Sequence, residues 1–215
     1  MTMILAFGDS ITYGACDIQG GWVQRLRKYL DEKQLNNPEL YYLTYNLGVS
    51  GETSKRLLDR LESEVKRRIK LMDEVEEVII IISIGVNDSK FNNKTKKNDI
   101  SIKEYISNVQ SILDISKKYS SKIVFVGSTP IDEKLVDPMP WREDFSYKSI
   151  FIENYNEAAA KVCNENNISF IETYNKFKEI KNYKKLLTDG VHPSSEGHKI
   201  FFEMIKNYLI KEKII

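Results

Sequence analysis

The apolar run at residues 78–84 is the feature that most limits how this chain can fold. It reads Val-Ile-Ile-Ile-Ile-Ser-Ile, rich in β-branched residues and without alternation between apolar and polar positions. Such a strand must be covered on both faces, as a central strand of a parallel sheet is when helices pack on each side. The whole apolar stretch, residues 78–86, is too short to cross a bilayer, which needs about 20 residues.

Four further runs resemble strands, and segments with apolar residues at helical spacing lie between them. Alternating strands and helices favour right-handed crossovers and a parallel sheet between two layers of helices. The sequence therefore predicts an α/β fold with a roughly five-stranded parallel sheet, in a single domain over residues 1–215. The expected strands span 3–7, 41–46, 78–84, 122–126 and 169–172, and the expected helices span 21–33, 54–72, 102–119, 150–164 and 195–210.

One segment, residues 129–148, does not fit this alternation. It holds three of the five prolines together with Trp141 and two further aromatic residues. The segment is too long for a tight connection between two elements. We expect a loop insertion, which either lies over the functional site or is mobile.

Composition excludes several classes of protein. The 32 Lys and Arg residues nearly balance the 31 Asp and Glu residues, which is unlike the basic footprint of a nucleic-acid-binding protein. The apolar N-terminus lacks the basic region of a signal peptide. The two cysteines are too few for a disulfide framework and lack metal-site spacing, and we expect Cys16 to be a small buried apolar group. These features predict a cytoplasmic protein without integral membrane association, and they leave the oligomeric state open.

Candidate catalytic residues follow the expected strands, where ligands bind in open parallel α/β sheets. Ser10 follows the first strand, a glycine-rich segment with Gly51 follows the second, and Asn87 follows the third. Asp189 and His192 lie three residues apart before the last helix. Serine needs an adjacent base to act as a nucleophile, histidine can serve as that base, and an aspartate can fix its tautomer. Donors near the developing oxyanion would complete the requirements of acyl transfer.

These residues resemble the four sequence blocks of the SGNH (GDSL-type) hydrolases, in the order that the family has them and over nearly the whole chain. Ile11 replaces the leucine that ends the first block, a change outside the chemistry. The resemblance implies a flavodoxin-like three-layer α/β/α sandwich and an esterase that needs no metal or cofactor. The matching residues are Gly8-Asp9-Ser10, Gly51, Gly85-x-Asn87-Asp88 and Asp189-x-x-His192-Pro193.

The same resemblance implies a role for each site residue. Ser10 would be the nucleophile, His192 its general base and Asp189 the partner that orients the base. The Ser10 N–H, the Gly51 N–H and the Asn87 side-chain amide would form the oxyanion hole.

Each of these residues also has a simpler interpretation. Ser10 could be only a helix N-cap, and Asn87 could merely stabilise its turn. Ser50 is a rival nucleophile, but Gly48-Val49-Ser50-Gly51 misses the spacing of a nucleophile elbow by one residue. Trp141 could pack internally or line the substrate pocket.

The sequence thus predicts a serine esterase that hydrolyses small or short-chain carboxyl esters, such as acetyl esters of sugars or metabolites, through an acyl-enzyme on Ser10. A lysophospholipase or thioesterase on the same scaffold is the main alternative. A non-catalytic flavodoxin-like binding module is another, and so is a metal-dependent phosphoesterase that uses Asp9, Asp88, Asp189 and His192. The physiological substrate, and the choice between hydrolysis and acyl transfer, are left open.

Overall fold

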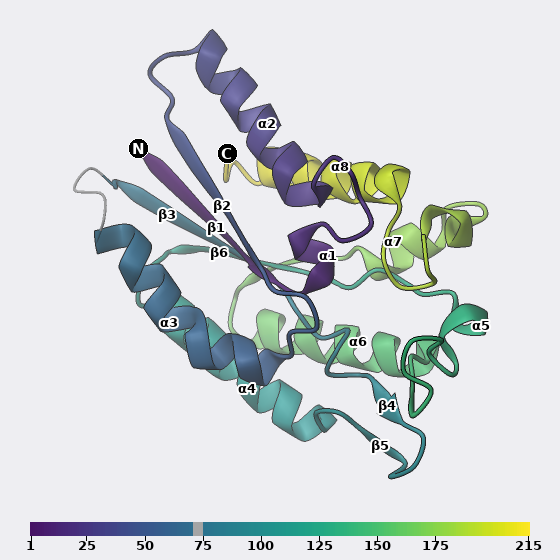
Figure 1. Ribbon diagram of the computed structural model, residues 1–215. Coiled ribbons are helices and arrows are strands. Elements are labelled where there is room, and N and C mark those ends of the chain that lie inside the picture. Colours follow the sequence, from purple (N-terminus) through teal and green to yellow (C-terminus); the bar gives the residue numbers. More distant parts are fainter. Residues whose placement is uncertain (71–74) are drawn as a thin grey trace.

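A parallel five-stranded sheet forms the centre of the molecule in the computed structural model, which describes residues 1–70 and 75–215 (Figure 1). The strands lie in the order β2-β1-β3-β6-β8, the strand order of a flavodoxin-like fold. The prediction of a central parallel sheet is confirmed. The strands are β1 (Thr2–Gly8), β2 (Tyr42–Gly48), β3 (Glu77–Ser83), β6 (Lys122–Val126) and β8 (Ser169–Ile171).

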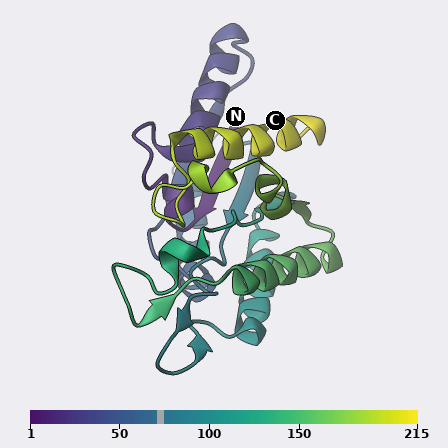
Figure 2. The same ribbon diagram turned by 90° about the vertical axis from the view of Figure 1, so that its right-hand side faces the viewer.

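Helices cover both faces of this sheet, so the predicted three layers are present. Figure 2 shows α2 and α8, in purple and yellow, on the opposite side of the sheet from the long helices α4 and α6, in teal and green. All five predicted helices form, although the last two residues of the expected 54–72 helix lie outside the described residues. The long helices are α2 (Gly21–Asn36), α3 (Ser54–Lys70), α4 (Ile102–Ser116), α6 (Ser149–Glu165) and α8 (Ser195–Lys211).

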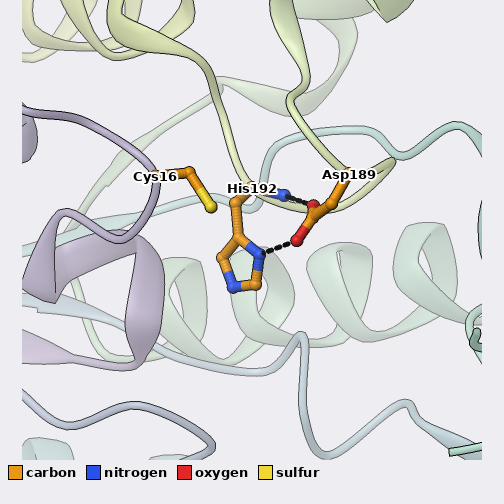
Figure 3. Close-up of side chains that lie close together, drawn as sticks. All are labelled: Cys16, Asp189 and His192. Atoms are coloured by element: carbon orange, nitrogen blue, oxygen red, sulfur yellow. Dashed lines mark hydrogen bonds and ion pairs between the residues drawn. The ribbon is translucent and has the colours of Figure 1, made fainter. Parts of the chain in front are cut away.

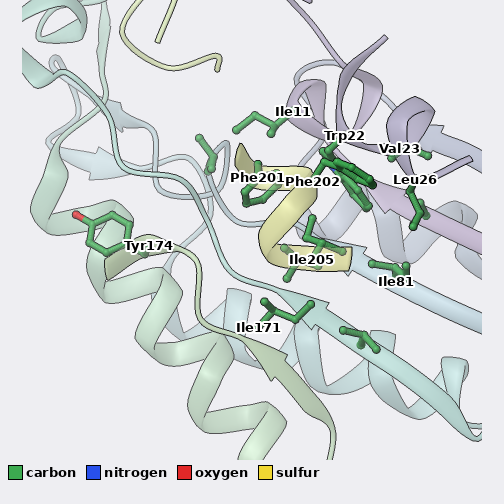
Figure 4. Close-up of a cluster of buried hydrophobic side chains, with 14 of the residues drawn as sticks. Ile11, Trp22, Val23, Leu26, Ile81, Ile171, Tyr174, Phe201, Phe202 and Ile205 are labelled. Atoms are coloured by element: carbon green, nitrogen blue, oxygen red, sulfur yellow. The ribbon is translucent and has the colours of Figure 1, made fainter. Parts of the chain in front are cut away.

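Alternate residues of the central strands belong to two separate hydrophobic clusters, one on each face of the sheet. Ile79 and Ile81 of β3 point into the cluster shared with α2 and α8, where Trp22 packs edge-on against Phe201 (Figure 4). Residues 80 and 82 of the same strand point into the cluster shared with α3, α4 and α6. All four isoleucines are fully buried, as expected of a strand covered on both faces. Each contributes roughly 1.5–3 kcal/mol through burial.

The segment 129–148 is tied to the rest of the molecule by a second, small sheet. It contains α5 (Glu133–Val136) and β7 (Phe145–Ser146), and β7 pairs antiparallel with β4 (Phe91–Asn92). β4 also pairs with β5 (Lys97–Asn98), which gives the order β5-β4-β7. The sequence does not predict this sheet, because two-residue strands carry no readable periodicity.

Three short helices complete the connections at the carboxyl edge of the central sheet. They are α1 (Ser10–Tyr13), α7 (Tyr174–Lys178) and the 3-10 helix η1 (Tyr183–Leu186). Within residues 1–70 and 75–215, every helix falls short of the length and apolar character that a membrane span requires.

Candidate active site

Ser10 stands at the turn between β1 and α1, at the carboxyl edge of the sheet. The preceding Asp9 caps α1, because its carboxylate accepts a hydrogen bond of 2.9 Å from the Ile11 N–H. Gly8 allows this turn to lie flat against its neighbours, since a Cβ there would come within 2.3 Å of the Ser83 carbonyl oxygen on β3. Ser10 is therefore the first residue of the short helix and not its cap.

Two hydrogen bonds join Ser10, His192 and Asp189, although 182 residues separate the serine from the histidine. The Ser10 Oγ lies 2.8 Å from His192 Nε2. The His192 Nδ1 lies 2.7 Å from Asp189 Oδ2 (Figure 3). Asp189 Oδ1 accepts hydrogen bonds from the backbone N–H groups of Val191 and His192. The loop before α8 thus holds the carboxylate and the imidazole in one fixed arrangement.

The electrostatics of Asp189 suit a carboxylate that stays ionised beside an imidazole. Partial burial alone would raise its pKa, but hydrogen bonds from the His192 side chain and from two backbone N–H groups outweigh burial and lower the pKa to about 2. An ionised Asp189 accepts the Nδ1 proton of a neutral imidazole. The Nε2 lone pair then faces the hydroxyl of Ser10, which is the arrangement that removes a proton from a serine during acyl transfer.

Asn87 follows β3 and lies beside Asp9, with its Nδ2 at 3.5 Å from Asp9 Oδ2. Its side chain is only 6% exposed, and its Oδ1 accepts a hydrogen bond of 2.9 Å from the Tyr147 hydroxyl. Tyr147 belongs to the segment 129–148. The sequence does not predict this contact. Only the proline- and aromatic-rich composition of the segment indicated that the segment could reach the site.

Gly51 lies in the turn after β2, which runs next to the Ser10 turn because the Val49 N–H donates to the Gly8 carbonyl. Its φ of +76° lies in the left-handed region, whereas a Cβ there would meet no atom within 4 Å. Glycine is thus required at this exposed position by backbone conformation and not by space. The partly buried ion pair between Glu52 and Arg60 links the turn to α3, and Arg60 also donates to the Leu47 carbonyl at the end of β2.

The two remaining acidic residues of the family blocks serve as internal hydrogen-bond acceptors. Asp88 is fully buried and accepts from both the N–H and the hydroxyl of Ser54, at the start of α3. Burial raises the pKa of Asp88 to about 7 and that of Asp9 to about 6, although hydrogen bonds to each carboxylate oppose the increase. Neither residue converges with Asp189 and His192 on a common point in the described part of the chain. The four residues that the metal-dependent phosphoesterase would use are therefore not gathered at one point.

One expectation about packing is wrong. Cys16 is exposed, and its Sγ lies within 4.8 Å of ligand atoms of Asp189 and His192 (Figure 3). Cys16 lies in the loop between α1 and α2 and has a left-handed φ of +65°. Trp141 is 52% exposed, which is against the interpretation that it packs internally, and its place in the substrate pocket stays a prediction. The apolar character of a side chain does not by itself show whether that side chain points toward the core or toward solvent when it lies in a loop.

A flavodoxin-like sheet with a Ser–His–Asp hydrogen-bond chain at its carboxyl edge defines the class of α/β esterases and acylhydrolases. The chain matches the model of the GDSL-like Lipase/Acylhydrolase family over residues 6–200. It belongs to that family and is an esterase of the GDSL type.

Curated relatives cover almost all of the chain. The isoamyl acetate-hydrolyzing esterase of Saccharomyces cerevisiae is 26% identical over an alignment of 209 positions, and the alignment covers 93% of this chain and 82% of the relative. The isoamyl acetate-hydrolyzing esterase 1 homolog of Homo sapiens is 25% identical over an alignment of 224 positions, and the alignment covers 98% of this chain and 82% of the relative.

Solved structures agree with the fold. A lipase/acylhydrolase from Enterococcus faecalis superposes with a TM-score of 0.72 at 22% identity, over 97% of this chain and 95% of that one. The acetylxylan esterase Axe2 from Geobacillus stearothermophilus gives a TM-score of 0.69 at 24% identity, over 95% of this chain and 92% of that one.

Proposed function

We propose that the protein hydrolyses small carboxyl esters with a short acyl group, acetyl esters foremost, through an acyl-enzyme on Ser10. The observation that carries the proposal is the pair of hydrogen bonds from Ser10 through His192 to Asp189, at 2.8 and 2.7 Å. The names of the yeast relative and of the acetylxylan esterase each specify an acetyl ester, which supports the short acyl group.

In the acylation step, Ser10 Oγ attacks the ester carbonyl carbon while His192 Nε2 takes the hydroxyl proton. The carbonyl oxygen becomes an oxyanion, for which the Ser10 N–H, the Gly51 N–H and the Asn87 amide are the proposed donors. The carbon–oxygen bond to the alcohol then breaks, and His192 gives its proton to the departing alkoxide. Asp189 stabilises the imidazolium throughout and does not itself take the proton.

In the deacylation step, a water molecule attacks the carbonyl carbon of acyl-Ser10 and His192 takes a proton from it. The Ser10–acyl bond breaks, the proton returns to Ser10 Oγ, and a carboxylic acid leaves. No step needs a metal ion or a cofactor.

We also propose a cytoplasmic location, since both cysteines are free thiols and such thiols persist in reducing compartments.

The test is the hydrolysis of 4-nitrophenyl acetate, butyrate and octanoate by the native protein and by Ser10→Ala. The substitution should reduce kcat/KM by at least about 10³-fold, because it removes the atom that forms the acyl-enzyme. Ser50→Ala is the matched control: it removes the rival serine in an exposed turn and should leave the rate unchanged. The acetate should be the fastest substrate.

Two results would contradict the proposal. Undiminished turnover by Ser10→Ala would show that another group is the nucleophile. A faster rate with the octanoate than with the acetate would favour the lysophospholipase or thioesterase alternative. Addition of a chelator should leave the rate unchanged, and a loss of activity would instead show that a metal ion takes part.

A further inference from the structure

A cavity of about 410 Å³ opens beside Gly51, the residue whose N–H is a proposed oxyanion donor. Its walls come from the turn after β2, the first turn of α3, the segments on either side of the β4–β5 hairpin, and the segment 129–148 (elements labelled in Figure 1). We call it the basic pocket, because its charged lining residues are Lys55, Arg56, Lys90, Arg142 and Asp99. A ligand in this pocket therefore lies next to the proposed oxyanion hole.

The charges in the basic pocket do not cancel. Lys90 is only 8% exposed and pairs with Asp99, with 2.9 Å between Nζ and Oδ2. Lys55 is 3.8 Å from Glu104 outside the pocket, a long and exposed contact that contributes little. Arg56 and Arg142 have no carboxylate within 4.0 Å among the residues that the structure describes. The pocket thus keeps an excess of positive charge, although the chain as a whole carries a net charge of only +1.

The small second sheet holds part of this charge in place. The Arg142 guanidinium lies 4.2 Å from the centre of the Phe145 ring, and Lys90 Nζ lies 5.2 Å from the same ring centre. Phe145 belongs to β7 and is paired with Asn92 of β4. A guanidinium stacked on a ring keeps its N–H edge free, and that edge matches the oxygen atoms of a carboxylate or phosphate.

We propose that the basic pocket binds an anionic carboxylate or phosphate group of the substrate, so that the enzyme prefers acetyl esters of negatively charged small molecules. The inference rests on the proposed function, because Gly51 links the pocket to the reacting ester. Arg56 and Arg142 provide the uncompensated charge, while Lys90 and Phe145 shape the wall. This substrate class differs from neutral alcohols, which would leave the two arginines without a partner.

The first experiment compares an anionic ester with a matched neutral one. We would measure kcat/KM for 4-acetoxybenzoate and for 4-acetoxybenzamide, and repeat both with 4-acetoxyphenyl phosphate as a second anionic ester. The native enzyme should favour the anionic esters by about 10-fold at low salt, and the preference should shrink at about 0.5 M salt because screening weakens exposed charges. The double variant Arg56→Gln/Arg142→Gln should lose the preference. Arg67→Gln, an exposed arginine farther along α3, is the matched control and should keep it.

A second experiment measures binding without catalysis. The Ser10→Ala protein would be titrated calorimetrically with benzoate, with phenyl phosphate and with neutral benzamide. Saturable binding of either anion that weakens about 10-fold in the Arg56→Gln/Arg142→Gln background supports the basic pocket and tells the carboxylate from the phosphate.

Failure of this proposal and failure of the esterase proposal are separable. An enzyme that hydrolyses 4-nitrophenyl acetate but shows no anionic preference and no arginine-dependent binding overturns the basic pocket alone. If no ester is turned over, the esterase proposal fails, and the calorimetric titration still decides whether the pocket binds anions.

Discussion

Removal of the Tyr147 hydroxyl provides a direct test of how the proposed oxyanion hole is held. The hydroxyl donates to Asn87 Oδ1 at 2.9 Å, and both side chains are buried. A side-chain amide can rotate so that its oxygen and nitrogen exchange places, and its orientation is set by a donor that faces the oxygen and an acceptor that faces the nitrogen. For Asn87 the shorter of these two contacts is the one from Tyr147, since the Nδ2 lies 3.5 Å from Asp9 Oδ2. Tyr147 therefore keeps the Asn87 oxygen on its own side and leaves the N–H group for another acceptor. In Tyr147→Phe this constraint is lost while the ring remains.

The size of the effect follows from two limits. Complete loss of an oxyanion donor, as in Asn87→Ala, should reduce kcat by about 10²–10³-fold. The hydrogen bond from Tyr147 is worth roughly 1 kcal/mol net, which changes the ratio of the two amide orientations by about 5-fold. We therefore expect Tyr147→Phe to lower kcat by at most about 5-fold, far less than Asn87→Ala does, with little change in KM, because the donor acts on the transition state and not on the bound ester.

The assay is 4-nitrophenyl acetate hydrolysis by Tyr147→Phe, Asn87→Ala and the double variant. Tyr147 is a positioning residue, so its substitution should add little to kcat once Asn87 is gone. Tyr183→Phe is the matched control, since it removes a hydroxyl that donates only to the Ile131 carbonyl. Thermal unfolding should show that the Tyr147→Phe protein stays folded despite a loss of about 1–3 kcal/mol from the unpaired Asn87 oxygen.

If Tyr147→Phe slowed the Asn87→Ala enzyme by the same factor as the native enzyme, Tyr147 would not act by orienting the Asn87 amide. Independent effects of that kind would mean that Tyr147 acts on the substrate or on the fold and not through the Asn87 amide.

Two further predictions concern Asp88 and Cys16. Burial raises the pKa of Asp88 from its usual 3.8 to about 7, so up to that pH the folded state keeps a proton that the unfolded state has lost. The free energy of unfolding should therefore fall as pH rises, by about 1 kcal/mol between pH 6.5 and 8. Thermal unfolding of Asp88→Asn should show a weaker dependence of stability on pH, and an unchanged dependence would contradict the raised pKa of Asp88. The contribution of His198 has the opposite sign, because burial lowers its pKa below 6.5 while the unfolded state still releases part of its proton above pH 6.5. This contribution is the same in the native protein and in Asp88→Asn, so the comparison of the two isolates Asp88. Maleimide should modify the exposed Cys16 and block ester turnover, because the Cys16 Sγ lies close to His192. Mass spectrometry should show one adduct, and Cys16→Ser should resist the inhibition. A fully active adduct would show that the thiol lies away from the path of the substrate.

Much of the fold could be read from local pattern. The unbroken isoleucines of β3 require cover on both faces, and the alternating strands and helices then restrict the chain to a few topologies. The same logic placed Ser10, Asn87 and His192 at one edge, because parallel strands all end on the same side of their sheet. The structure adds that Ser10 and His192 are within hydrogen-bond distance.

Other features depended on contacts between segments that share no local signal. The sheet formed by β4, β5 and β7 has strands of two residues each, and the Tyr147–Asn87 hydrogen bond joins positions 60 residues apart. The prediction that Cys16 is buried was wrong because side-chain type predicts burial only when a periodic element sets the direction of the side chain.

The sequence by itself therefore determined the sheet, its helix layers and the edge at which Ser10 stands, since burial of apolar faces at a fixed period dictates these. Only the tertiary structure decided that Tyr147 orients Asn87 and that Arg56 and Arg142 face one cavity beside Gly51. Those contacts depend on how an irregular segment folds back over the sheet, and no local periodicity encodes such a path.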